Sequence, residues 1–200
     1  MTGASPSTSP VVRSAAQSPA SLAAYPHLLA DTLTEPRPRL RLWPFVVLAA
    51  LGHSALTIAA SPPLGWWPFT LIAILPLVWS ATLTTLKPGR AGLLTLAGVL
   101  PLSAYLQWWV IEVTAFGFIP FLVVQSMWPA FFVWITGRAH RRFPGVPLSI
   151  IVPVAWVGVE FVRGELFLNG YAWGLVAHPL IEAPALAAPA VFLGQYFVSF

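Results

Sequence analysis

The chain has 200 residues, of which 58% are hydrophobic and only 8% are charged, too few charges to cover a soluble surface. Its formal charge of +4 does not indicate nucleic-acid binding, because the basic residues lie in short gaps between apolar runs and form no periodic face. The absence of cysteine excludes disulfides, a thiolate nucleophile and a zinc-thiolate site. We therefore predict an all-α, polytopic transmembrane helix bundle, with no metal site and no cofactor.

Residues 1–38 are rich in Ser, Pro and Ala, and their apolar residues are too scattered to build a core. We predict a disordered cytoplasmic tail there and one transmembrane domain over 39–200. The basic stretch 37–41, just before the first apolar run, resembles an uncleaved signal anchor. Cleavage after Ala59 or Ala60 is the alternative.

A helix needs about 20 apolar residues to cross about 30 Å of hydrocarbon, because each residue rises only about 1.5 Å. The fifth apolar stretch is shorter than the others, and the sixth carries two prolines and stops within apolar sequence. We predict five complete spans and a truncated sixth, at 43–60, 64–83, 91–111, 116–136, 147–162 and 183–200.

Lys and Arg residues are enriched in cytoplasmic loops of membrane proteins, and they orient this chain. A cytoplasmic N-terminus leaves Arg163 alone on the outer side and places the other basic residues near span ends inside: Arg37, Arg39, Arg41, Lys87, Arg90, Arg138, Arg141 and Arg142. The acidic side chains of the spans and their loops then fall on or near the outer face: Glu112, Glu160, Glu165 and Glu182. We therefore expect the polar functional groups of the domain at its outer face.

Glu160 and Arg163 are three residues apart, so they share one helical face at the outer end of the fifth span. Ionisable groups near a bilayer are costly, which makes the pair a candidate functional feature. A structural ion pair that fixes the helix end is favoured over direct catalysis, because no reacting partner stands nearby.

The segment from Gly164 to Glu182 contains the turn signal Asn169-Gly170 and a proline, and is not predicted to be a spanning helix. Tyr171 and Trp173 could line an access path for acyl chains. Aromatic side chains also collect at membrane interfaces because their rings are amphipathic, and for each residue that explanation is favoured. The candidate structural or lipid-contact residues are Glu160, Arg163, Gly170, Tyr171 and Trp173.

Other polar residues lie within the apolar runs. His53, with Ser54 and Thr57, and Gln107 could form hydrogen bonds between helices, and for His53 packing is favoured over a proton relay. His178 is interpreted as a solvated loop histidine. No catalytic residue is predicted, since the only Asp lies in the tail and the only Lys in a cytoplasmic loop.

Three motifs in this order resemble the apolipoprotein N-acyltransferase family. They are a Pro-Pro-x-Gly-x-Trp-Pro-like hairpin at 62–68, an aromatic end to the third span followed by Phe116-Gly117, and Glu160-x-x-Arg163-Gly164 followed by 170–174, Gly-Tyr-Ala-Trp-Gly. The resemblance covers roughly residues 40–200. This chain has Ala172 where the family usually has proline, and residues 177–180 depart from a Gly-Tyr-Ser-Gln-like stretch.

The resemblance implies an enzyme of the bacterial cytoplasmic (inner) membrane that matures lipoproteins. Its acyl donor would be a phospholipid and its acceptor the N-terminal diacylglyceryl-cysteine of an apolipoprotein, among membrane lipids and without nucleic acid. The family's chemistry belongs to a nitrilase-like domain with a Glu-Lys-Cys triad, which these 200 residues do not contain. We therefore expect this chain alone to be inactive. The alternatives are a non-enzymatic membrane scaffold, a transporter fragment and a small partner protein that ends at Phe200.

Overall fold

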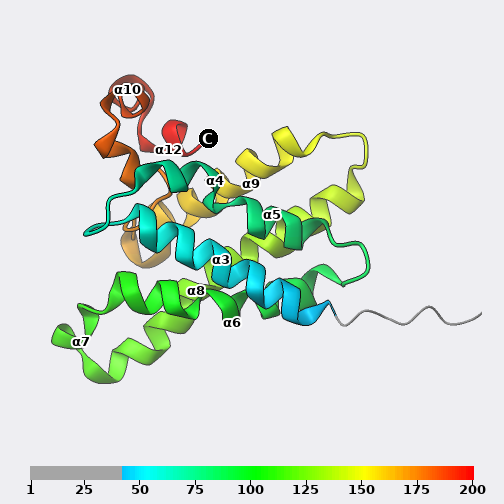
Figure 1. The fold of residues 1–200 in the computed structure, drawn as a ribbon, viewed down its shortest axis with the longest axis horizontal. Coiled ribbons are helices and arrows are strands. Elements are labelled where there is room, and N and C mark those ends of the chain that lie inside the picture. Colours follow the sequence, from blue (N-terminus) through cyan, green and yellow to red (C-terminus); the bar gives the residue numbers. More distant parts are fainter. Residues whose placement is uncertain (1–41) are drawn as a thin grey trace, which may run out of the picture. The chain divides into compact units, whose positions relative to one another are not determined.

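Helix α3 (Trp43–Ala60) begins the part of the chain, residues 42–200, that the computed structural model describes (Figure 1). The predicted tail, 1–38, lies outside the described residues. Helix α3 has the bounds predicted for the first span, and its proline at 44 is tolerated because the first turn leaves N–H groups unbonded anyway. Ser61, with extended backbone, ends the helix before the two prolines at 62 and 63.

The second predicted span, 64–83, is an interrupted helix. It consists of the 3₁₀ turn η1 (Trp67–Phe69), α4 (Thr70–Ala73) and α5 (Leu75–Thr82). Pro76 lies in the first turn of α5. It has no N–H with which to continue the hydrogen bonds of α4, which accounts for the break at Ile74.

The third and fourth predicted spans correspond to α6 (Pro88–Gln107) and α8 (Ala115–Arg142). Helix α6 ends before the aromatic pair Trp108-Trp109, and the short helix α7 (Val110–Val113) takes up the end of the predicted 91–111 span. Helix α8 extends past the predicted end at 136 and is capped at its start, where the Thr114 hydroxyl oxygen accepts from Gly117 N at 3.1 Å.

The fifth predicted span corresponds to α9 (Leu148–Phe161), which continues into a π-helical turn, η2 (Val162–Leu166). Two 3₁₀ turns come next, η3 (Phe167–Asn169) and η4 (His178–Glu182). The predicted sixth span, 183–200, is not one continuous helix. It forms α10 (Pro184–Ala187), α11 (Ala190–Leu193) and α12 (Gln195–Ser199), because Pro189 and the positive φ of 79° at Gly194 interrupt it.

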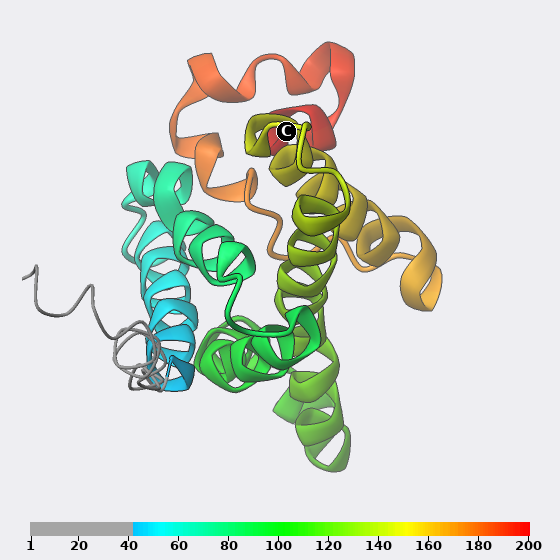
Figure 2. The same cartoon turned by 90° about the vertical axis from the view of Figure 1, so that its right-hand side faces the viewer.

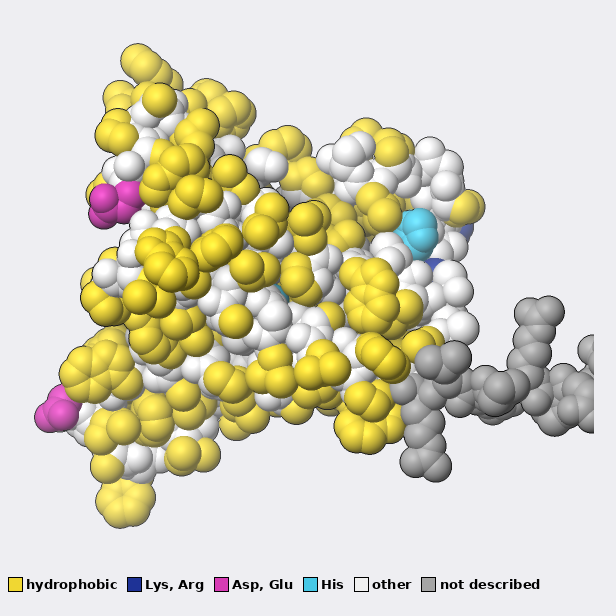
Figure 3. Space-filling model, in the orientation of Figure 1, with side chains coloured by type: hydrophobic (Ala, Val, Ile, Leu, Met, Phe, Trp, Pro, Cys, Tyr) yellow, Lys and Arg dark blue, Asp and Glu magenta, His cyan; other side chains and the backbone are white. Residues whose placement is uncertain are grey.

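Three of these helices are long and apolar enough to cross a membrane: α3, α6 and α8. Figure 2 shows α8 passing between α9 and the pair formed by α3 and α6, and α8 contacts both α6 and α9. Small residues allow the close approach, since a Cβ on Gly98 of α6 would lie 2.4 Å from the Cβ of Ala50 in α3. Phe132, Val99 and Leu77 are fully buried in the core, while many leucine, isoleucine and phenylalanine side chains are exposed over the sides of the bundle (Figure 3).

The connecting segments alternate between the two ends of the bundle (Figure 1). At the end that we call the acidic end lie 61–66, 108–114 and 162–200, and Figure 3 shows acidic side chains there at the left. The opposite, basic end carries 83–87 and 143–147 together with Lys87, Arg90, Arg138, Arg141 and Arg142. The charges are thus separated along the bundle as the sequence predicted, with Arg163 the one basic residue of the described range at the acidic end.

Candidate functional site

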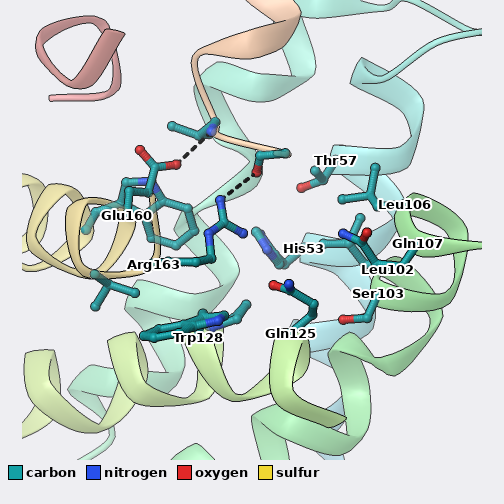
Figure 4. Close-up of a pocket in the computed structure, with 15 residues that line it drawn as sticks. His53, Thr57, Leu102, Ser103, Leu106, Gln107, Gln125, Trp128, Glu160 and Arg163 are labelled. Atoms are coloured by element: carbon teal, nitrogen blue, oxygen red, sulfur yellow. Dashed lines mark hydrogen bonds between the residues drawn. The ribbon is translucent and has the colours of Figure 1, made fainter. Parts of the chain in front are cut away.

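Glu160 and Arg163 come from the end of α9 and its π turn, and both bind the backbone of the segment 174–176 (Figure 4). Glu160 is 2% exposed, and its Oε1 accepts a hydrogen bond from Val176 N at 2.7 Å. The Arg163 Nη2 donates to the carbonyl oxygen of Gly174 at 3.2 Å. The sequence predicted an ion pair between the two side chains. The hydrogen bonds in the structure go instead to one backbone segment, which both residues fix against the helix end.

Gly170 and Tyr171 determine the loop conformation that brings the segment 174–176 to the end of α9. Gly170 has φ of 100°, and a Cβ there would lie 2.7 Å from the carbonyl oxygen of Gly164. Tyr171 N then donates to the Arg163 carbonyl at 3.0 Å, and the Tyr171 hydroxyl donates to Gln107 Oε1 of α6. The edge of its ring meets Phe121 of α8, with ring centroids 5.3 Å apart. Tyr171 therefore joins the loop to α6 and α8.

The Tyr171 phenol stays protonated over the ordinary pH range. Burial raises the pKa of Tyr171 above its usual value of 10.0, while the Gln107 hydrogen bond and the Arg163 charge act in the opposite direction. A neutral phenol is the form that donates to Gln107. The last candidate, Trp173, is 68% exposed, and its side chain makes no hydrogen bond to another residue of the described range 42–200.

A cavity of about 60 Å³ lies between these groups and the helices α3, α6 and α8 (Figure 4). His53 of α3 lines it and donates from Nδ1 to the Ala73 carbonyl at 2.7 Å. Several polar atoms of its lining have no hydrogen-bond partner among the described residues: Thr57 Oγ1, both amide atoms of Gln125, Trp128 Nε1 and Arg163 Nε. The volume exceeds what one water molecule needs, so small polar groups fit there.

A larger depression of about 530 Å³, which we call the vestibule, lies at the acidic end. Tyr105, Trp108, Trp173 and His178 are among the residues that line it. It shares four lining residues with the inner cavity: Thr57, Leu106, Gly174 and Val176. The segment 174–176, held by Glu160 and Arg163, therefore forms the wall between the cavity and the vestibule together with Thr57 of α3 and Leu106 of α6.

The structure thus brings together four of the five predicted site residues in one hydrogen-bonded unit and places Trp173 in the vestibule. The prediction of hydrogen bonds between helices holds for His53 and for Ser54, which donates to the Gly98 carbonyl at 3.1 Å. Gln107 bonds the loop residue Tyr171 and not a helix, and the Thr57 hydroxyl has no partner among the described residues. Sequence reasoning missed Gln125, Trp128, Trp156 and the Val176 amide. The amide side chain of Gln125 within an apolar helix was a usable signal, because polar groups at membrane depth are rare.

Among known proteins, the family model described as the apolipoprotein N-acyltransferase N-terminal domain matches residues 53–200, which contain every site residue named above. The chain belongs to this family. Curated apolipoprotein N-acyltransferases similar to it come from Geobacter metallireducens (29% identical, covering 76% of this chain and 30% of the relative), Rhodopirellula baltica (24%, 76% and 28%) and Photobacterium profundum (28%, 74% and 30%). The chain thus spans about 30% of the length of these relatives.

In this N-acyltransferase N-terminal domain, the structure gives a physical reason for the glycines of the two outer-loop motifs. A Cβ on Gly164 would lie 2.1 Å from the hydroxyl of Tyr196, which donates to Glu165 Oε1 at 2.8 Å. Gly170 supplies the left-handed backbone conformation and approaches Gly164 closely. The motifs therefore act as one unit: Gly164 leaves room for the Tyr196 hydroxyl, Gly170 lets the backbone approach Gly164, and the Glu-x-x-Arg pair holds the segment 174–176.

Proposed function

We propose that the chain is the membrane part of an apolipoprotein N-acyltransferase, which transfers an acyl chain from a phospholipid to the N-terminal diacylglyceryl-cysteine of lipoproteins. The family membership and the names of the relatives support the reaction class. The observation that carries the proposal is the assembly of Glu160, Arg163, Gly170 and Tyr171 into one bonded unit beside an aromatic vestibule. An enzyme that takes a lipid from the bilayer needs such an opening at a membrane surface.

We further propose a bacterial cytoplasmic (inner) membrane location with the N-terminus in the cytoplasm. The acidic end, with the vestibule, then faces outward. The gathering of basic residues at the opposite end supports this orientation. Within the domain 39–200, α3, α6 and α8 have the length of full spans, and we propose that 67–82 and α9 complete the five. The segment 183–200 then serves as a broken sixth element at the outer surface.

In this proposal the described site has a structural and lipid-contacting role, and the nitrilase-like catalytic domain with its Glu-Lys-Cys set lies outside these 200 residues. Glu160, Arg163, Gly170 and Tyr171 shape the wall of the vestibule, while Trp173 offers an exposed ring to the lipid. The 200 residues alone should therefore transfer no acyl chain.

A chimera tests the proposal. Residues 1–200 are joined to the part of the Geobacter metallireducens relative beyond its matching region, and the product is expressed in a bacterium whose own N-acyltransferase can be shut off. Mass spectrometry of a lipoprotein N-terminal peptide measures N-acylation. We expect N-acylation with the chimera, none with residues 1–200 alone, and less with Glu160→Leu than with the exposed control Glu112→Gln.

Two outcomes would contradict the proposal. A chimera that inserts into the membrane at normal levels and leaves the lipoprotein unacylated would favour a non-enzymatic scaffold. N-acylation by residues 1–200 without a further domain would show that catalysis does not need the nitrilase-like part.

A further inference from the structure

The basic end of the bundle has no acidic counterpart within residues 42–200. Its charged residues are Lys87, Arg90, Arg138, Arg141 and Arg142, whereas the four glutamates of the described chain all lie toward the other end. Positive charge at one end is expected from membrane topology alone. The arrangement of three of these arginines goes beyond that expectation, because they line one depression of about 660 Å³.

The three arginines are held differently. The guanidinium of Arg141 donates to the carbonyl of Leu83 at 2.8 Å and to that of Leu86, so it fixes the 83–87 loop. Arg138 lies over the ring of Trp134, 5.6 Å from its centroid, and Arg142 lies 5.5 Å from the ring centroid of Phe143. Stacking on an aromatic face restrains a guanidinium but leaves its N–H groups free to bind an anion.

An apolar groove of about 540 Å³ between α8 and α9 continues from this depression. The two share Ile135 and Ala139, and the remaining lining of the groove is apolar, including Ile150, Gly158 and Val159 of α9. From Ile150 to Val159 the helix rises roughly 14 Å at about 1.5 Å per residue. That distance is close to half of the roughly 30 Å hydrocarbon thickness, or one leaflet.

We propose that the depression and the groove together bind one anionic phospholipid. Its phosphate lies between Arg138 and Arg142, and one acyl chain lies in the groove between α8 and α9. Basic pockets next to membrane helices suit anionic head groups, because the arginine fork matches the phosphate oxygens. A zwitterionic lipid would bring its own cation to the basic end and should bind less well. The site lies at the end opposite the vestibule and does not depend on the proposed function.

Lipid titrations followed by native mass spectrometry test this site on the full chain in detergent. The probes are phosphatidylglycerol and, for comparison, phosphatidylcholine with the same acyl chains. We expect phosphatidylglycerol to bind at least tenfold more tightly. The double variant Arg138→Gln, Arg142→Gln should weaken phosphatidylglycerol binding roughly a hundredfold, since each charge-assisted hydrogen bond lost from a guanidinium to the phosphate contributes about tenfold.

The matched control removes the same charge from the same end but outside the depression. Lys87→Gln, Arg90→Gln should weaken binding less than fivefold. Gly158→Leu probes the groove separately, because a Cβ on Gly158 would meet no atom within 4 Å and the change should not disturb the fold. It should weaken binding of long-chain phosphatidylglycerol and leave a dihexanoyl analogue unaffected.

Three results would overturn the proposal. Equal losses in the two double variants would show a diffuse charge effect and no site. Equal binding of phosphatidylcholine and phosphatidylglycerol would show that the arginines do not select an anionic head group. An unchanged affinity of Gly158→Leu for long-chain phosphatidylglycerol would show that the acyl chain does not bind in the groove.

Discussion

Replacing Glu160 by leucine should release the segment 174–176 from the end of α9. The Glu160 carboxylate accepts from Val176 N at 2.7 Å and is 2% exposed, so leucine leaves a buried backbone donor without its partner. An unpaired buried group costs about 1–3 kcal/mol. Glu160→Gln keeps an acceptor oxygen of the same reach for the Val176 amide and should cost less than about 1 kcal/mol, because the buried donor keeps a partner.

Hydrogen exchange measures this effect at the segment itself. With the chain in detergent, mass spectrometry follows deuterium uptake of a peptide that covers 174–182. A loss of about 1–3 kcal/mol in local stability raises the exchange rate of the Val176 amide roughly 5- to 150-fold when exchange occurs through local opening. Peptides of α3 and α6 should exchange as in the parent chain, and Glu160→Gln should lie close to the parent throughout.

Arg163 allows a second test of the same segment, because its Nη2 donates a hydrogen bond to the Gly174 carbonyl. Arg163→Met should also raise the exchange rate of the segment 174–176. The double variant should lose less local stability than the sum of the two single variants, because both bonds restrain the same segment and the loss of one already releases it. Unchanged exchange in Glu160→Leu, or equal exchange in Glu160→Leu and Glu160→Gln, would refute the assignment of the carboxylate as the restraint on Val176.

Three further variants test other parts of the structure. Gly170→Ala should destabilise the chain by about 1–3 kcal/mol in detergent unfolding, since φ is 100° and the Cβ would lie 2.7 Å from a carbonyl oxygen, whereas Gly158→Ala should cost nothing measurable. Gly98→Ala should cost about 1–3 kcal/mol by forcing α3 and α6 apart, and normal stability would contradict their close contact. Tyr171→Phe should cost about 1–3 kcal/mol by leaving Gln107 Oε1 unpaired. Because the pKa of Tyr171 is raised on folding, its contribution is complete below about pH 10 and falls at higher pH, so the variant should lose less stability on alkaline titration than the parent.

The sequence predicted the helical class and the separation of charge, because apolar run lengths and the positions of basic residues follow directly from the cost of polar groups in hydrocarbon. It also placed Glu160 and Arg163 correctly on one face at a helix end. It could not predict the backbone groups with which their side chains form hydrogen bonds. The backbone of 174–176 reaches them only through the loop conformation that Gly170 and Tyr171 impose, and no periodic pattern encodes that conformation.

The differences between the predicted spans and the helices of the structure have local causes that were visible in the sequence. Pro76 and Pro189 lie inside apolar runs, and both coincide with interruptions in the structure. The continuation of α8 to Arg142 was missed for the opposite reason: apolar content falls after Thr136, but Arg141 gains partners in the 83–87 loop, which supports the extra turns. Hydropathy alone predicts where a helix can be buried in lipid, and not where it ends.

The polar lining of the inner cavity is costly to keep in a membrane bundle. Gln125 is 5% exposed and neither atom of its amide has a partner among the described residues, as is the case for the Thr57 hydroxyl. Apolar side chains of similar size would fill the same space without about 1–3 kcal/mol per unpaired group. Segment 174–176 is part of the wall between this cavity and the vestibule, so its displacement would widen the path from the vestibule to these atoms. The bonds from Glu160 and Arg163 stabilise this part of the wall. In variants of Glu160, the stability of the segment and the access of groups from the vestibule to the polar lining should therefore change together.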